Sequence, residues 1–252
     1  SRVASQAIFS EEVRVLEEQG DWVKIETIID SYQGWIKKET CAAVEKLPKK
    51  TVMIDRIAAH LYHVTDTEFG PIMTLPFESR LELIEELPDS DRRWLKVKLP
   101  NNKEAFVQRG DCLLIPQKLT REQMVAFSKY FLGLPYTWGG RSSFGYDCSA
   151  FVQMLYRQMG VYIPRDSKDQ IKWDGFQSIE MNELQPGDLI FWGKSAQKIN
   201  HVGMYLGEGK FIHTIASVEK KPYLRISSVN DPAWDAKPTN YHAFRAAKTL
   251  KG

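Results

Sequence analysis

The sequence predicts a C-terminal α+β domain preceded by two small all-β units. Three observations predict this class: alternating strand patterns fill the first part of the chain, two helical patterns with clear end signals follow, and strand patterns then resume. The expected units are residues 1–48, 49–116 and 117–252. With 43% hydrophobic and 26% charged residues, the chain has an ordinary globular composition that can bury a sizeable core.

Short strands separated by polar turns fill the first two units. The first contains EEVRVLEEQ, DWVKIETI and YQGWIKKE; the second contains RLELIEEL, RWLKVKL and EAFV. Both follow the order of strand, turn, Trp-bearing strand, turn and strand, so we expect two β-barrels of SH3-like type. Pro116 and Gln117 form the expected linker to the third unit.

Two helices are predicted at the start of the third unit. The first has Thr120 as a candidate N-cap, Gln123 in the capping-box position and Gly133 as a stop signal. The second, CSAFVQMLYRQMG at residues 148–160, repeats apolar residues at four-residue steps and ends in glycine. The later segments DLIFWG, HVGMYLG, KFIHTI, LRISSV and HAFRAA predict antiparallel strands.

Net charge and hydrophobic runs limit which partners the chain can be expected to bind. The net charge of +2, from 34 Lys and Arg against 32 Asp and Glu, provides no bulk field to recruit nucleic acid or an anionic membrane. No apolar run approaches the roughly eighteen residues of a membrane span.

The first ten residues lack an initiator Met and the apolar core of a signal peptide, which fits a mature chain that begins after a removed segment. The three cysteines, at positions 41, 112 and 148, argue against a disulfide framework.

Cys148 stands at the predicted start of the second helix. Backbone N–H groups and the positive end of the helix dipole stabilise a thiolate there, so we expect an activated thiol. His201, expected to open one strand, and His213, on the next, can approach each other across a hairpin. They would supply a base and a group that orients it. On spacing alone, a buried packing cysteine and two ordinary strand histidines are the competing interpretation.

Zinc is a rival for these side chains. Cys148 and the two strand histidines are ligand types that zinc uses, but the spacing is unlike that of zinc motifs. His60 and His63 with Asp66 could hold a surface metal, although such residues are more often exposed side chains of a loop that bind no metal. We therefore expect no metal and no other cofactor.

Ordered motifs in four segments resemble those of a known family. The segments LGLPYTWGGRSSFGYDCSAFVQ, IPRDSKDQ, LQPGDLIFW and HVGMYLGEGKFIHT are similar to the NlpC/P60 family of papain-like cysteine peptidases, over about residues 119–247. The resemblance implies a papain-like catalytic domain with Cys148 as nucleophile, His201 as general base and His213 as its polar partner. Ala150 stands where the family usually has Gly, and alanine suits a helix better.

A narrower resemblance concerns the substrate. The segment PRDS, together with SQAIFSEEV and SYQGWI, resembles the γ-D-glutamyl-L-diamino acid endopeptidases with N-terminal SH3-like domains. It implies that Glu11, Tyr32 and Asp166 hold the free amine of an N-terminal L-alanine, with the adjacent Glu12 as the alternative acid. The remaining residues expected to line the substrate site are Tyr136, Asp147, Ser149 and Ser167.

The resemblance implies a cysteine endopeptidase that cuts the γ-D-glutamyl-diamino acid bond of murein stem peptides and releases L-Ala-D-Glu for recycling. The third residue, diaminopimelate or lysine, stays open. One alternative is a hydrolase that remodels intact cell wall; another is an inactive wall-binding protein. We expect a monomer in the cell envelope, periplasm or medium, with the cytoplasm left open.

Overall fold

The computed structural model describes residues 3–44, 46–216, 222–230 and 243–251. Its contacts divide the chain into two compact units. The N-terminal unit contains residues 5–116 and 142–144, and the C-terminal unit contains the rest.

The N-terminal unit begins with a three-stranded antiparallel sheet, β1 (Val13–Gln19), β2 (Trp22–Thr27) and β3 (Gln33–Lys37), followed by the short helix η1 (Lys38–Thr40). These strands are the three that the alternating patterns predict. Gly20 turns the chain between β1 and β2 with a φ of 56°, a conformation that favours glycine. Val23 and Ile25 of β2 are buried, whereas most of β1 is exposed.

A seven-stranded sheet follows in the same unit. In spatial order its strands are β10 (Cys112–Leu113), β4 (Thr51–Ile54), β7 (Arg80–Glu86), β8 (Trp94–Lys98), β9 (Glu104–Gln108), β5 (Ala58–Tyr62) and β6 (Met73–Pro76). The short helices η2 (Asp89–Asp91) and η3 (Arg109–Asp111) connect some of them. Aliphatic residues such as Val52, Leu61 and Val107 form its buried core.

The repeated strand order describes only part of this sheet. β7, β8 and β9 match RLELIEEL, RWLKVKL and EAFV, but β4, β5 and β6 precede them without a counterpart in the first sheet. These three strands are only four or five residues long, and β4 and β6 do not alternate between buried and exposed positions. Periodicity could not predict them for that reason. The boundary between two SH3-like domains at residue 48 stays a prediction.

The C-terminal unit places helices before a six-stranded antiparallel sheet, as predicted. In spatial order the strands are β13 (Phe176–Ile179), β18 (Phe244–Leu250), β14 (Leu189–Ser195), β15 (Lys198–Gly207), β16 (Lys210–Thr214) and β17 (Leu224–Ser228). The helices are α1 (Arg121–Ser128), α2 (Cys148–Gln158) and α3 (Ser167–Gln170), with short η4 (Lys129–Phe131) and η5 (Met181–Glu183). A two-stranded hairpin, β11 (Arg141–Ser142) and β12 (Gly145–Tyr146), precedes α2.

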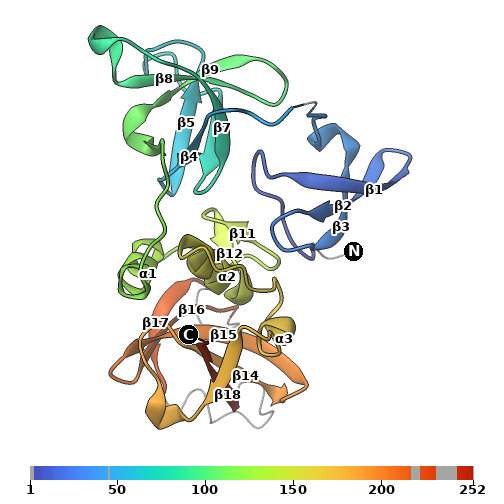
Figure 1. The fold of residues 1–252 in the computed structure, drawn as a ribbon, viewed down its shortest axis with the longest axis vertical. Coiled ribbons are helices and arrows are strands. Elements are labelled where there is room, and N and C mark those ends of the chain that lie inside the picture. The colour runs from blue at the N-terminus through green and yellow to red at the C-terminus, as the bar shows by residue number, and fades with distance from the viewer. Residues whose placement is uncertain (1–2, 45, 217–221, 231–242, 252) are drawn as a thin grey trace. The chain divides into compact units, whose positions relative to one another are not determined.

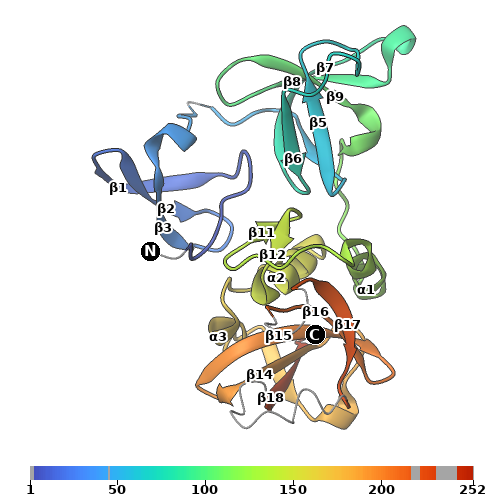
Figure 2. The same cartoon turned by 180° about the vertical axis from the view of Figure 1, so that it is seen from behind.

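Helix α2 is the central helix of this unit. It contacts β15 and β16, and Figures 1 and 2 show it beside the sheet that these strands form. Its residues from Ser149 to Tyr156 are all buried, so packing on every side stabilises it. The first helix, α1, begins with the predicted capping box, in which Thr120 and Gln123 each bond the other's backbone N–H.

Two strand boundaries differ from expectation. β15 starts at Lys198, so His201 lies inside the strand and does not open it. The extension arises because Lys198 and Ile199 pair with β14 across an irregular register near Gly193. The last strand starts at Phe244, and His242, which begins the predicted segment HAFRAA, lies outside the described residues.

Candidate active site

The thiol of Cys148 lies at the first residue of α2. Asp147 is the N-cap, and its Oδ1 accepts a hydrogen bond of 2.8 Å from the backbone N–H of Ala150. The backbone N–H groups of Ser149 and Val202 lower the pKa of the Cys148 thiol. Val202 directly follows His201 on β15, and α2 contacts that strand.

Burial opposes ionisation of this thiol. It raises the pKa of Cys148 to about 12, and the nearby carboxylate of Asp147 raises it further. The two backbone N–H groups and the charge of Arg165 act in the opposite direction but do not outweigh burial. A thiolate here needs a proton acceptor, and His201 is the candidate because it lies on β15, which contacts α2.

His201 and His213 are hydrogen-bonded to each other. Nε2 of His201 lies 2.9 Å from Nδ1 of His213, and both residues are buried. Their strands pair directly, and Gly203 makes room for the contact. A methyl group at Gly203 would lie 2.9 Å from Cδ2 of Phe211 and 3.2 Å from Cβ of His213. The hairpin thus brings together the two histidines that the sequence paired.

A serine on the next strand contacts the second histidine. Nε2 of His213 lies 2.9 Å from Oγ of Ser227 on β17. Sequence reasoning missed Ser227. A signal did exist, because the segment LRISSV was predicted as a strand beside KFIHTI, but the pairing register was unknown.

Arg165 is a second residue that sequence reasoning missed. Its guanidinium makes two hydrogen bonds to the Asp147 carboxylate, of 2.7 and 3.0 Å, and a third of 3.0 Å to Oγ of Ser149. Only 1% of the Arg165 side chain is exposed. Burial lowers the pKa of Arg165, but the ion pair with Asp147 outweighs it and the net pKa is raised. Arg165 therefore holds the start of α2, where Cys148 lies.

Asp166 follows Arg165 and lies at the N-cap position of α3, yet its side chain makes no capping hydrogen bond. It lies 3.7 Å from Nζ of Lys168 and is half-buried. Burial raises the pKa of Asp166, against the lowering effect of the neighbouring Arg165 and Lys168. Ser167 is the first residue of α3. A partly buried carboxylate without a capping role is suited to binding a cation.

Tyr136 pairs with strand residues near the nucleophile. It forms a parallel bridge with Tyr146, two residues before Cys148 in sequence. Its backbone N–H donates to the carbonyl of Pro222. The structure thus brings Tyr136 into the segment that leads to α2.

Glu11 and Tyr32 lie in the N-terminal unit. Oε2 of Glu11 accepts a hydrogen bond of 2.9 Å from the backbone N–H of Ile8, and Glu11 is half-buried, whereas Glu12 is exposed. Tyr32 follows a turn in which its backbone N–H donates to Oγ1 of Thr27. The described structure thus distinguishes the two adjacent acids by burial.

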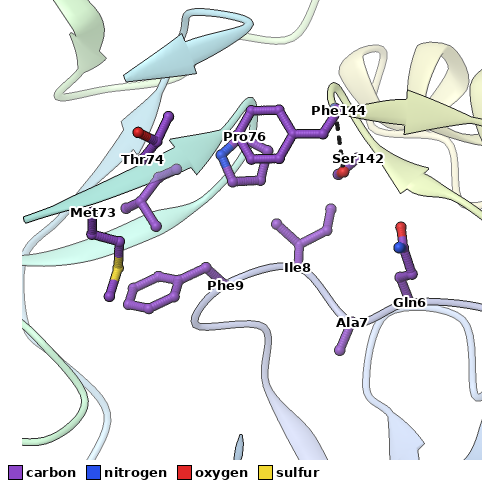
Figure 3. Close-up of a pocket in the computed structure, with 10 residues that line it drawn as sticks. Gln6, Ala7, Ile8, Phe9, Met73, Thr74, Pro76, Ser142 and Phe144 are labelled. Atoms are coloured by element: carbon purple, nitrogen blue, oxygen red, sulfur yellow. Dashed lines mark hydrogen bonds between the residues drawn. The ribbon is translucent and has the colours of Figure 1, made fainter. Parts of the chain in front are cut away.

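Ile8, whose backbone N–H donates to Glu11, lines a pocket in the N-terminal unit. The pocket has a volume of about 370 Å³ and is mostly apolar; Figure 3 shows Ile8 and Phe9 on one side and Met73 on another. The full lining is Gln6, Ala7, Ile8, Phe9, Met73, Thr74, Leu75, Pro76, Ser142 and Phe144. Apart from the bond between Ile8 and Glu11, no residue predicted for the site lines it.

The described residues contain no group of three or more His, Cys, Asp or Glu side chains that could hold a metal ion. His60 bonds Oγ1 of Thr74 through Nδ1, at 2.9 Å, and Asp66 accepts from the backbone N–H of Glu68. Among the helices in the described part of the chain, none is long and apolar enough to cross a membrane.

Two family models match the chain. Residues 133–242 match the NlpC/P60 family, and residues 1–40 match the bacterial dipeptidyl-peptidase Sh3 domain. A γ-D-glutamyl-L-lysine dipeptidyl-peptidase of Bacillus subtilis is 35% identical over 84% of this chain and 72% of its own length. One of Bacillus cereus is 32% identical over 85% and 68%. The chain belongs to the NlpC/P60 family.

A solved structure supports the same membership. The crystal structure of an NlpC/P60 family protein from Bacillus cereus has a TM-score of 0.81 and 27% identity, and covers 98% of this chain and 82% of that chain. The predicted fold class, an α+β NlpC-type domain preceded by SH3-like β-structure, is confirmed. The prediction of a cysteine peptidase is confirmed as well. The roles of individual site residues stay predictions.

Proposed function

We propose that this NlpC/P60 peptidase hydrolyses the γ-D-glutamyl-diamino acid bond of peptidoglycan stem peptides that carry a free N-terminal L-alanine. One observation supports the chemistry most directly. The backbone N–H of Val202, the residue after His201, lowers the pKa of the Cys148 thiol, and His201 is hydrogen-bonded to His213. Two observations support the substrate class: the similarity to two dipeptidyl-peptidases over most of the chain, and the match of residues 1–40 to the bacterial dipeptidyl-peptidase Sh3 domain.

The proposed reaction has two steps. Cys148 gives its proton to His201 and its sulfur attacks the γ-carbonyl carbon of D-glutamate. The bond to the diamino acid breaks, and His201 passes the proton to the leaving amine. Water then attacks the thioester, with His201 as base, and L-Ala-D-Glu leaves while Cys148 regains its proton. The backbone N–H at the start of α2 is a candidate oxyanion donor.

The free amine determines which substrates bind in this proposal. An ammonium group taken out of water needs close carboxylates and acceptors, and Glu11, Tyr32 and Asp166 are assigned to it. In intact peptidoglycan this nitrogen is part of an amide, so the acids would remain unpaired. Discrimination of this kind can reach roughly 10⁴-fold.

The test uses purified protein and five substrates. These are L-Ala-γ-D-Glu-L-Lys, the same peptide with diaminopimelate, the N-acetylated form of each, and intact sacculi. We expect L-Ala-D-Glu from the free peptides, little from the acetylated ones, and none after Cys148→Ala. Cys41→Ala, which alters a half-exposed cysteine in the N-terminal unit, is the matched control and should keep full activity.

One relative favours a second candidate. The murein DD-endopeptidase MepH of Escherichia coli is 31% identical over 53% of this chain and half of its own length. Cleavage of sacculi without cleavage of the free peptides would replace the recycling proposal with hydrolysis of intact wall. Cleavage of acetylated and free peptides at equal rates would eliminate the amine pocket.

A further inference from the structure

His201, His213 and Ser227 form one chain of hydrogen bonds across three adjacent strands. The bond between the histidines joins β15 to β16, and the bond from His213 to Ser227 joins β16 to β17, each at 2.9 Å. His213 has no exposed surface. Both ring nitrogens of His213 therefore have a protein partner, and the two partners together determine which nitrogen carries the proton.

The proposed base restricts the tautomer of its partner. Nε2 of His201 faces His213, so the nitrogen of His201 left to accept the thiol proton is Nδ1. Before the transfer His201 then carries its proton on Nε2, and after it on both nitrogens. In both states Nε2–H of His201 donates to Nδ1 of His213. Nδ1 of His213 must be an acceptor throughout, so its proton must be on Nε2.

The hydroxyl of Ser227 lies where that proton points. We propose that Ser227 is a positioning residue, which accepts the Nε2–H of His213 and thereby holds the neutral tautomer that keeps His201 ready as a base. Neutral histidine has two tautomers, and a hydroxyl can also donate, so position alone does not choose between them. The direction follows from the bond to His201. This inference rests on the proposed roles of Cys148 and His201.

The neighbouring packing limits what can replace the hydroxyl. The His213 ring packs against the tilted ring of Phe211, with the ring centroids 4.6 Å apart, and Phe211 is opposite Ser227 in the strand register. A group without a hydroxyl at position 227 would leave the buried Nε2–H without this acceptor. The other tautomer of His213, with its proton on Nδ1, would then compete. In that tautomer Nδ1 of His213 donates a hydrogen bond, so Nε2 of His201 would have to accept it.

Two substitutions that are isosteric with each other separate the effect of the hydroxyl from that of side-chain shape. Ser227→Thr keeps a hydroxyl as acceptor. Ser227→Val has the shape of threonine without the hydroxyl, and both residues suit a strand. We expect Ser227→Thr to retain kcat within about threefold and Ser227→Val to lower kcat about tenfold with KM unchanged, since the buried N–H of His213 would lose this acceptor. Ser228→Ala, on the opposite face of β17, is the control.

Two measurements do not need the peptide substrate. Nitrogen NMR of histidine-labelled protein should show His213 with pyrrole-type Nε2 and pyridine-type Nδ1 in the wild type, and a mixture in Ser227→Val. The rate at which iodoacetamide alkylates Cys148 at neutral pH, measured by mass spectrometry of the peptide that contains Cys148, should fall in Ser227→Val and not in Ser227→Thr.

A wild-type His213 protonated on Nδ1, or equal rates for the Thr and Val variants, would overturn the assignment of Ser227. Wild-type protein that shows the expected tautomer and alkylation but cleaves none of the peptides would instead contradict the proposed function and leave Ser227 in place. The two failures are therefore distinguishable.

Discussion

Arg165 and Asp147 form a two-pronged ion pair, with N···O distances of 2.7 and 3.0 Å, directly beside the nucleophilic candidate. Asp147 is the N-cap of α2, and Cys148 is the first residue of that helix. The position of the thiol thus depends on a carboxylate whose charge is matched by a buried guanidinium from a segment 18 residues away.

Removal of the guanidinium should destabilise the protein and displace Cys148. In Arg165→Met, Asp147 would keep a largely buried charge without its partner, which typically costs about 3–5 kcal/mol. We expect the free energy of unfolding in urea to fall by that order and kcat to drop with it. The control is Lys210→Ala, which breaks the exposed ion pair with Glu208 and should change stability by about 1 kcal/mol or less. Equal effects of the two variants would contradict the role of Arg165.

The raised pKa of Cys148 predicts how its reactivity depends on pH. In His201→Ala the imidazole proposed to take the proton is absent, so the thiolate fraction should follow the pKa of about 12. The alkylation rate should then rise about tenfold per pH unit from pH 7 to 10 without a plateau, because only the thiolate reacts. In the wild type we expect a faster rate at pH 7 and a shallower slope.

Cys112 is the internal reference for this measurement. Burial and the charges of Asp111 and Asp55 raise its pKa to about 12 as well, and it lies in the other unit. Its slope should be the same in wild type and His201→Ala. If Cys148 shows an early plateau in the variant, burial does not control its ionisation.

Gly203 is predicted to tolerate a side chain poorly. In Gly203→Ala the new methyl group would overlap Phe211 and press on His213, and overpacking of this kind costs about 1–3 kcal/mol. Because β16 must shift, the bond between the histidines should lengthen, and kcat should fall more than stability alone explains. Kinetics at a temperature where the variant is fully folded measures this. Gly110→Ala, where a methyl group would meet no atom within 4 Å, should leave kcat unchanged.

Asp166 should make binding of the free amine sensitive to acid. Its raised pKa means that it gains a proton at a higher pH than an ordinary aspartate and loses the charge that attracts an ammonium group. We expect KM for the free tripeptide to rise as pH falls, and Asp166→Asn to raise KM by roughly 10- to 100-fold and abolish that rise, as expected for a charged hydrogen bond. Asp169→Asn, an exposed acid of α3, is the matched control. An unchanged KM in Asp166→Asn would remove this residue from the amine pocket.

Local patterns predicted the elements that hold the site. The capping box at Thr120, the helix that starts at Cys148 and the strands of the His201 and His213 hairpin are all visible in the sequence, because each depends on residues within one or two turns. The strands β4 to β6 were missed, since strands of four or five residues leave little periodic signal.

By itself the sequence determined the α+β class, the start of α2, the pairing of the two histidines and the family. Only the tertiary structure decided that burial dominates the ionisation of Cys148, that Arg165 neutralises Asp147, and that Ser227 meets His213. The physical reason is distance along the chain. Helix and strand patterns depend on near neighbours, whereas desolvation and side-chain bonds depend on which remote segments pack together.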